Sequence, residues 1–376
     1  MSTNMFGLVV IPDGVIITKY NGNRKKVTIP EELDGYPVVA IDRNAFRGTL
    51  VEHVVGKSIK RIGKYAFADT KMLKEVDFPF LEKIDDFAFS KSALKRFFVG
   101  PHVSCISVQA FVDSCIERYF VAENNEMYRT EDGSLASGDM LVRFKRGSAN
   151  AVLNEIKIIG AHAFDGTEVL NISCPNLTMI GAYAFAWTKL KSFLLPPRVK
   201  YIGEYAFAHS DLQNVFIPSS VQEIGKYAYA NCYSLRSVYI GEGLEEVPGY
   251  CFFGDRLLKH VILSYVEKIN TNAFAHCRSL CDIDLSHVKQ FGTHAFFRSG
   301  LTNVDLVSME VIKSGAFKGC KQINSITLSS KYYEDRFDLF EKYFDVEEVA
   351  ADDCAAFDET PYIRYHRSQI GMEEIA

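Results

Sequence analysis

Apolar residues recur along this chain in a fixed frame, and each repeat of the frame contains an Ala-Phe pair or a close substitute. The aromatic residue returns every 21 to 23 residues, apart from one interval of 53. Its positions are Phe46, Phe67, Phe89, Phe111, Phe164, Phe185, Phe207, Tyr229, Phe252, Phe274, Phe296 and Phe317. A fixed period of this length is typical of stacked repeats, in which each unit buries its apolar residues against its neighbours. The pattern therefore predicts a solenoid with the aromatic rings stacked in its interior.

A single repeat also predicts its own local structure. Val215 and Ile217 alternate with outward positions, which is the two-residue period of a short strand. Pro218 has no N–H and ends that strand. A second short segment reaches Ile224, and Gly225 then marks a tight bend where a side chain or a negative φ would be costly. We therefore expect the strands of successive units to lie side by side in one continuous parallel sheet.

The repeat consensus, L-x-x-V-x-I-P-x-x-V-x-x-I-G-x-x-A-F-x-x-C, resembles the BspA-like, treponema-type family of leucine-rich repeats. The resemblance covers about residues 15 to 328. It implies a right-handed repeat solenoid with a parallel β-sheet on the concave face, made mostly of strands and turns with short helical segments. Members of the family, mostly bacterial surface proteins, bind host or matrix proteins, mediate adhesion or coaggregation, or have no known role. The resemblance therefore implies a non-enzymatic protein that binds a protein or a glycan.

The repeat pattern and its interruptions divide the chain into five segments. The long interval leaves about 31 residues beyond one unit, and the Gly138-Asp139 pair within it suits a hairpin turn. A helical stripe over 332–344, with Ser330 as its cap, begins where the repeats stop. The expected segments are an N-terminal β cap (1–40), a first block of repeats (41–111), a hairpin-type insert (112–158), a second block of repeats (159–328) and an acidic C-terminal capping segment (329–376).

Composition narrows the classes of function. The chain has 376 residues and a net charge of −5, and its lysines and arginines are scattered, which argues against nucleic acid as a partner. No apolar run reaches the ~18 residues of a membrane span. Catalytic motifs such as a P-loop, H-E-x-x-H or C-x-x-C are absent from the sequence, and we expect no cofactor. An enzyme would need a closed cleft, for which the 112–158 insert offers the best place.

The cysteines indicate packing instead of redox chemistry. The chain has nine, without disulfide-type spacing. Cys232, Cys277 and Cys320 stand three residues after the aromatic, where other units have Thr or Ser, so the position favours a small side chain that forms weak hydrogen bonds. We interpret His276, Cys277 and Cys281 as structural in preference to a zinc site. Unpaired cysteines and the lack of a recognisable signal peptide favour the cytoplasm, whereas the family resemblance implies the cell surface or exterior.

The outward strand positions are the best candidates for a binding site. Each strand places one outward residue between its two inward ones, and in four successive units this residue is apolar or aromatic. The four residues are Leu194, Phe216, Tyr239 and Ile262. In register they would form an exposed stripe on the concave face, and such stripes mark partner-binding sites. The alternative is that aromatic and β-branched residues simply suit strands.

Acidic residues lie in the adjoining units. Asp282, Asp284 and Asp305 cluster with His260, and Asp284 and Asp305 would lie ~5 Å apart on neighbouring rungs. That spacing is similar to the carboxylate pair of a retaining glycosidase, but an open sheet provides no pocket. The preferred alternatives are a cation site, a contact for a basic partner, or solvated surface acids. At the level of the whole protein, the alternatives to a binding protein are a scaffold or spacer that self-associates through the stripe, and an enzyme.

Overall fold

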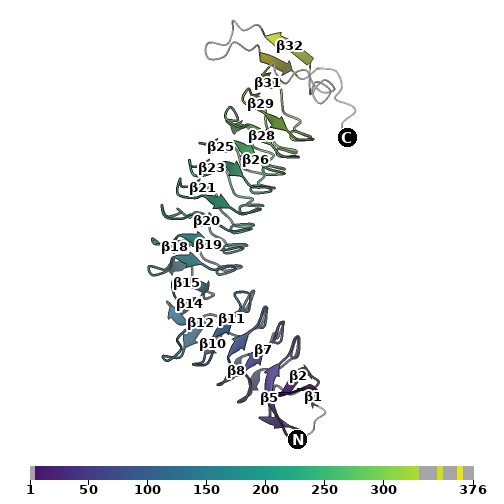
Figure 1. The fold of residues 1–376 in the computed structure, drawn as a ribbon, viewed down its shortest axis with the longest axis vertical. Helices are drawn as coiled ribbons and strands as arrows, with labels where there is room; N and C mark the ends of the chain where they lie inside the picture. Colours follow the sequence, from purple (N-terminus) through teal and green to yellow (C-terminus); the bar gives the residue numbers. More distant parts are fainter. Residues whose placement is uncertain (1–4, 330–344, 350–361, 367–376) are drawn as a thin grey trace. The chain divides into compact units, whose positions relative to one another are not determined.

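The structure, a computed structural model, describes residues 5–329, 345–349 and 362–366. The chain divides into two compact units, Met1–Lys189 and Leu190–Ala376, and each is described by itself. Every regular element in the described residues is a β-strand (Figure 1). The solenoid of stacked parallel strands predicted from the sequence is therefore confirmed. The expected short helical segments are wrong for the described residues, because two strands and two turns already fill each period of about 22 residues.

Each turn contributes one longer strand that pairs in parallel with its equivalent in a neighbouring turn. In the first unit these strands are β3 (Lys26–Thr28), β6 (His53–Val55), β8 (Glu75–Asp77), β10 (Arg96–Val99), β12 (Arg118–Val121), β16 (Asn150–Val152) and β18 (Asn171–Ser173). In the second unit they are β21 (Asn214–Ile217), β23 (Ser237–Ile240), β25 (His260–Leu263), β27 (Asp282–Ile283), β29 (Asn303–Leu306) and β31 (Ser325–Ser329). Their outward side is called the strand face below. In β21, Val215 and Ile217 are buried while Asn214 and Phe216 face outward, so the predicted alternation is confirmed.

The expectation of one continuous sheet is wrong. The longer strands form separate groups: β3-β6-β8, β10-β12 and β16-β18 in the first unit, and β21-β23-β25-β27 and β29-β31 in the second. The interruption after β27 follows a short strand, since β27 spans only Asp282–Ile283 and offers few backbone groups for a ladder. The group β21-β23-β25-β27 is the longest of them and carries the candidate site.

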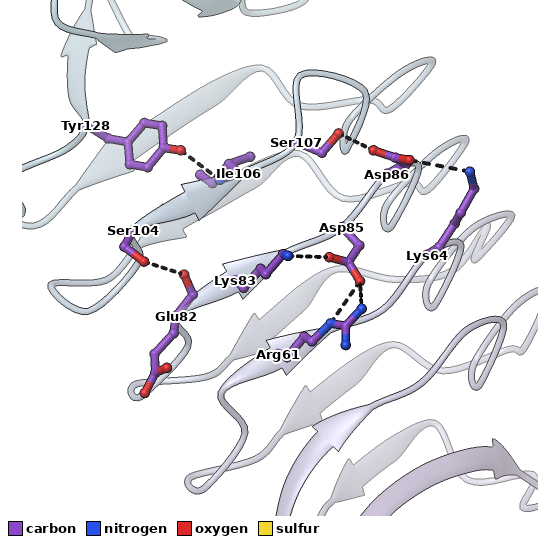
Figure 2. Close-up of polar contacts among 10 residues, drawn as sticks. All are labelled: Arg61, Lys64, Glu82, Lys83, Asp85, Asp86, Ser104, Ile106, Ser107 and Tyr128. Carbon is purple, nitrogen blue, oxygen red and sulfur yellow. Dashed lines mark hydrogen bonds and ion pairs between the residues drawn. The ribbon is translucent and has the colours of Figure 1, made fainter.

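Shorter strands of successive turns also pair in parallel, in ladders that are likewise separate from one another. In the first unit these strands are β7 (Arg61–Ile62), β9 (Lys83–Ile84), β11 (Cys105–Ile106), β17 (Ile158–Ile159) and β19 (Met179–Ile180). In the second unit they are β20 (Tyr201–Ile202), β22 (Glu223–Ile224), β24 (Glu246–Val247), β26 (Lys268–Ile269), β28 (Gln290–Phe291) and β30 (Val311–Ile312). Figure 2 shows polar side chains of neighbouring turns paired beside these strands: Arg61 Nε donates to Asp85 Oδ2 at 2.9 Å, and the Ser107 hydroxyl donates to Asp86 at 2.6 Å.

The repeat aromatics stack inside the solenoid as the sequence predicted. Within each unit, consecutive rings that are one period apart lie 4.8–5.6 Å from each other and within 19° of parallel. The rings of Phe46, Phe164 and Phe274 are among those with no exposed surface. Because one turn cannot cover its own ring, each ring is buried only by the turns on either side, and stability depends on every interface between turns.

The turn around each aromatic is held by backbone hydrogen bonds to the next turn. Tyr227 and Asn231, two residues before and two after Tyr229, have φ near +60°, which is uncommon for non-glycine residues. In this conformation the N–H of Tyr229 donates to Cys251 O at 2.9 Å and that of Asn231 to Phe253 O at 2.8 Å. The strain is therefore offset by hydrogen bonds along the stack.

The explanation expected for Gly225 is wrong in part, because its φ is not positive. A Cβ atom at this position would lie 2.3 Å from the backbone nitrogen of Glu204 in the preceding turn. The Gly225 N–H donates to Ile202 O at 2.7 Å. Glycine is thus required by the close approach of two backbones and not by the dihedral angle.

The position three residues after each aromatic behaves as predicted. Thr70 Oγ1 donates to Phe67 O at 2.7 Å, in its own turn, whereas Cys232 Sγ donates to Phe207 O at 3.2 Å, in the preceding turn. Both bonds satisfy a buried carbonyl beside the aromatic ring. Asp255 occupies the equivalent position in the next turn and is fully buried, which the sequence analysis did not anticipate.

The long interval between aromatics contains a three-stranded antiparallel segment. It consists of β13 (Arg129–Glu131), β14 (Ser134–Ser137) and β15 (Met140–Arg143). Gly138, with φ of 55°, lies in the turn between β14 and β15, so the predicted hairpin turn is confirmed. The buried Arg143 guanidinium donates to the carbonyls of His162 and Asp165, which fastens this segment to the following turn.

The first repeat begins beside an antiparallel hairpin. The hairpin is formed by β1 (Phe6–Ile11) and β2 (Gly14–Tyr20), and β2 pairs in parallel with β5 (Tyr36–Ile41), which also pairs with β4 (Glu32–Leu33). Tyr20 stacks on Phe46 at 5.0 Å, so the hairpin covers the first ring of the interior stack.

At the other end, β31 pairs antiparallel with β33 (Tyr362–His366), which pairs antiparallel with β32 (Asp345–Val349). The stripe predicted over 332–344 and its cap Ser330 lie outside the described residues. The predicted segment boundaries remain predictions. No helix in the described part of the chain has the length and apolar character of a membrane span.

Candidate functional site: the strand face of the second unit

Three of the four predicted stripe residues lie in register on adjacent strands. The backbone pairs Phe216 with Tyr239, and Tyr239 with Ile262. The rings of Phe216 and Tyr239 stack at 4.9 Å and 4° from parallel. Phe216 is 47% exposed and Ile262 58% exposed, while Tyr239 between them is half-buried. These three side chains form one exposed apolar patch.

The fourth predicted residue, Leu194, is 77% exposed but lies in no strand. Pro196 and Pro197 follow it and supply no N–H for a ladder. The expectation that Leu194 forms a paired rung of the stripe is therefore wrong.

The Tyr239 hydroxyl gives the patch a polar edge. Ser264 Oγ donates to it at 3.3 Å, from the residue that follows β25. A tyrosine whose ring packs on a neighbour and whose hydroxyl is held in place loses little further freedom on binding. The patch therefore combines apolar area with an oriented hydrogen-bonding group.

The predicted acidic group is divided into separate contacts. His260 Nδ1 lies 2.8 Å from Asp282 Oδ2, across the register pair of β25 and β27, and both side chains are exposed. Asp284 accepts the Ser286 N–H at 2.9 Å, and the Ser286 hydroxyl, together with this N–H, lowers the pKa of the Asp284 carboxyl. Asp305 accepts the Val307 N–H at 3.3 Å. Each aspartate thus accepts a hydrogen bond from the backbone two residues further along the chain.

Asp284 and Asp305 line the same open depression, together with Asn303 and Thr327. No set of three or more His, Cys, Asp or Glu side chains suited to a metal ion occurs in the described residues.

His276 and Cys277 make packing contacts. His276 packs its ring edge-to-face on Phe253, and Cys277 Sγ donates to Phe252 O at 3.0 Å. These contacts agree with the interpretation of both residues as structural.

The sequence analysis missed two further aromatic groups on the surface. Phe120 pairs in register with Phe98 on the strand face of the first unit, and both are exposed. Phe120 was missed because β12 lies in the long interval between repeat aromatics, where the sequence period no longer indicates which residues face outward. At the turns of the second unit, Tyr205, Tyr227 and Tyr250 stack at 4.5 and 4.4 Å. Their recurrence two residues before the repeat aromatic could have revealed them.

Comparison with known proteins supports the repeat assignment. The family model described as "BspA type Leucine rich repeat region (6 copies)" matches residues 19–131, 157–281 and 245–356. No curated protein sequence matches the chain.

Solved structures share the fold at low sequence identity. The pneumococcal vaccine antigen PcpA is 20% identical with a TM-score of 0.61, over 83% of this chain and 90% of its own. A leucine-rich repeat protein from Bacteroides ovatus is 23% identical with a TM-score of 0.60, over 90% of this chain and 97% of its own. Another, from Eubacterium ventriosum, is 20% identical with a TM-score of 0.58, over 84% and 93%.

Proposed function

Because the chain belongs to the BspA-type leucine-rich repeat family, we propose that it is a non-enzymatic binding protein that holds a protein or glycan partner on its strand face. The observation that carries the proposal is the stacked pair Phe216 and Tyr239 with Ile262 in register beside it. By family resemblance, the binding would serve adhesion or contact with a host or matrix component.

Two properties of the patch support this proposal. Aromatic residues contribute most of the binding energy at protein interfaces, where they are anchored by well-packed surroundings. The patch lies on paired strands, so its side chains are presented by a fixed backbone. The adjoining His260–Asp282 pair supplies a polar margin, as the rims of interfaces usually do.

We expect the double substitution Phe216→Glu and Tyr239→Glu to abolish capture of the partner. Two carboxylates would replace the stacked rings and would have to lose water on binding, which is unfavourable unless each finds a new partner group. The wild-type chain is immobilised, a captured partner is identified and purified, and its affinity for wild-type and variant chains is measured by calorimetry. Thermal unfolding should change little, because both side chains are at the surface.

The matched control is Leu257→Glu with Tyr265→Glu, which adds the same charge at exposed apolar positions outside the patch. This control should bind normally. If the partner binds the Phe216→Glu and Tyr239→Glu variant as well as the wild type, the patch is not the binding site. If light scattering instead finds a wild-type dimer that the double substitution converts to a monomer, the patch serves self-association.

A further inference from the structure

A second surface of this protein lies on the turns of the second unit and not on the strand face. It comprises four turn segments, 249–257, 270–279, 292–300 and 313–322, here called the basic turn edge. Its exposed basic side chains are Arg256, Arg278, Arg298, Lys313, Lys318 and Lys321. The four segments contain a single acidic residue, Asp255, which is fully buried. Positive charge is thus concentrated on this edge of a chain whose net charge is −5.

The arginines of the edge lie near one another. Burial and the neighbouring guanidiniums of Arg298, Arg278 and Arg256 lower the pKa of His276, so all three arginines act on one ring. The Arg298 guanidinium lies 5.0 Å from the centre of the Phe297 ring. Phe297 in turn meets the His276 ring edge-to-face at 5.2 Å. Arg298 is therefore supported by aromatic side chains that pack against one another.

These arginines have no carboxylate partner among the described residues. The equivalent edge of the first unit differs, since Arg47 pairs there with Asp69 and Lys64 with Asp86. Two acidic side chains that flank the basic turn edge along the chain are engaged elsewhere: Glu267 with Lys289, and Asp282 with His260. Arg256, Arg278 and Arg298 therefore retain positive charge that no carboxylate in the described part of the chain neutralises.

We propose that the basic turn edge binds a sulfated polysaccharide, laid along the successive turns. Adjacent turns are ~4.8 Å apart, so the charges form a row that suits a linear polymer with closely spaced anionic groups. Arginine forms bidentate hydrogen bonds with the oxygens of such groups. A glycan with sparse charges would leave part of the row unpaired.

The surface is less suited to other polyanions. Bases of single-stranded nucleic acid stack on free aromatic faces, whereas Phe253, His276 and Phe297 pack on one another and Arg298 lies over Phe297. A folded protein partner would need exposed apolar anchors, and Leu257 is the large apolar side chain exposed in these described segments.

The test measures binding of a fluorescent heparin oligosaccharide to the full chain at low ionic strength. The triple substitution Arg256→Gln, Arg278→Gln and Arg298→Gln should weaken binding by at least about tenfold, because three charge-assisted contacts are lost. The control triple Arg47→Gln, Lys64→Gln and Lys71→Gln removes the same charge from the turns of the first unit. It should change the affinity by less than about threefold, because Arg47 and Lys64 are already paired with Asp69 and Asp86 and have less charge to offer an anionic ligand.

Several outcomes would overturn the proposal. They are no binding by the wild type, an equal loss in the control triple, or equal binding of a desulfated oligosaccharide of the same length. Single-stranded DNA that binds as tightly, and loses affinity in the same triple variant, would show a nucleic-acid site instead. If the arginine triple variant unfolds, the double substitution Arg256→Gln and Arg278→Gln, at two exposed side chains, must still weaken binding. The Phe216→Glu and Tyr239→Glu variant should bind the oligosaccharide normally, which separates this site from the strand-face patch.

Discussion

Replacing Phe274 by alanine should lower the free energy of unfolding by about 3–5 kcal/mol. The Phe274 ring has no exposed surface and lies between those of Phe252 and Phe296, at 5.3 Å from each. Its removal leaves a cavity that the neighbouring turns cannot close easily. Their spacing is fixed by backbone hydrogen bonds, such as that from the Phe274 N–H to Ala295 O at 2.8 Å. Urea unfolding followed by circular dichroism gives the change directly.

The control for this prediction is Tyr265→Ala. Tyr265 is an aromatic residue of the same unit that is 60% exposed, so its loss should change stability by less than about 0.5 kcal/mol. Equal destabilisation by the two substitutions would show that the interior stack is not the main source of stability. A Phe274→Ala effect below about 1 kcal/mol would mean that the turns can relax around the missing ring.

The stacking of turns could be predicted from the sequence because a single interaction repeats. Phe207, Tyr229 and Phe252 recur at nearly equal spacing, and only a parallel stack brings such residues together in one interior. The register of Phe216, Tyr239 and Ile262 could be predicted for the same reason, since both intervals are 23 residues. A period therefore determines which residues are neighbours, both inside and outside the solenoid.

The period does not determine the backbone conformation within each turn. Tyr227 adopts a left-handed conformation although its side chain is bulky, because backbone hydrogen bonds between the aligned turns stabilise that conformation. Gly225 is required by the backbone of the preceding turn, which lies far from it in sequence. Both features depend on contacts between turns. The conformational preferences of single residue types therefore cannot explain them.

The basic turn edge was missed for a different reason. Arg256, Arg278 and Arg298 are about one period apart, but in the linear sequence they stand among acidic residues that lie on the strands. The net charge of −5 is a sum over all faces and hides a local excess of one sign. Charge patterns in a repeat protein therefore need to be read by position within the repeat.

Substituting asparagine for Asp255 should make the protein more stable at neutral pH. Asp255 is fully buried, Oδ1 accepts the Cys232 N–H at 2.7 Å, and Oδ2 has no hydrogen-bond partner in the described residues. Burial raises the pKa of this carboxyl well above its ordinary value of 3.8. Asparagine keeps the accepting oxygen and the shape of the side chain but never ionises. The wild-type chain, in contrast, must on folding either bury the charged carboxylate or take up a proton that the unfolded chain has lost, and both cost free energy. The asparagine variant avoids this cost.

The sign of the pH dependence follows from the raised pKa. Between pH 3.8 and the pKa in the folded state, the unfolded chain loses the Asp255 proton and the folded chain keeps it. The stability that this residue contributes is therefore fully present below the lower value and falls as pH rises, by about 1.4 kcal/mol per pH unit. The advantage of Asp255→Asn over the wild type should widen over this range and become constant above the folded pKa. Urea unfolding of both proteins with a reductant, from about pH 4 to pH 8, measures the difference and cancels the titration of other groups.

The matched control is Asp284→Asn, where the expected sign is opposite. Hydrogen bonds from Ser286 lower the pKa of the Asp284 carboxyl, so the charged form is the one that the fold stabilises. The stability from Asp284 is present above its ordinary pKa of 3.8 and is lost as pH falls through the lower folded value. Asp284→Asn should therefore be no more stable than the wild type at neutral pH, with a difference that stays constant above about pH 5. If Asp255→Asn gave the same flat profile, Asp255 would be ionised in the folded protein, and its charge would have to be balanced inside the turn.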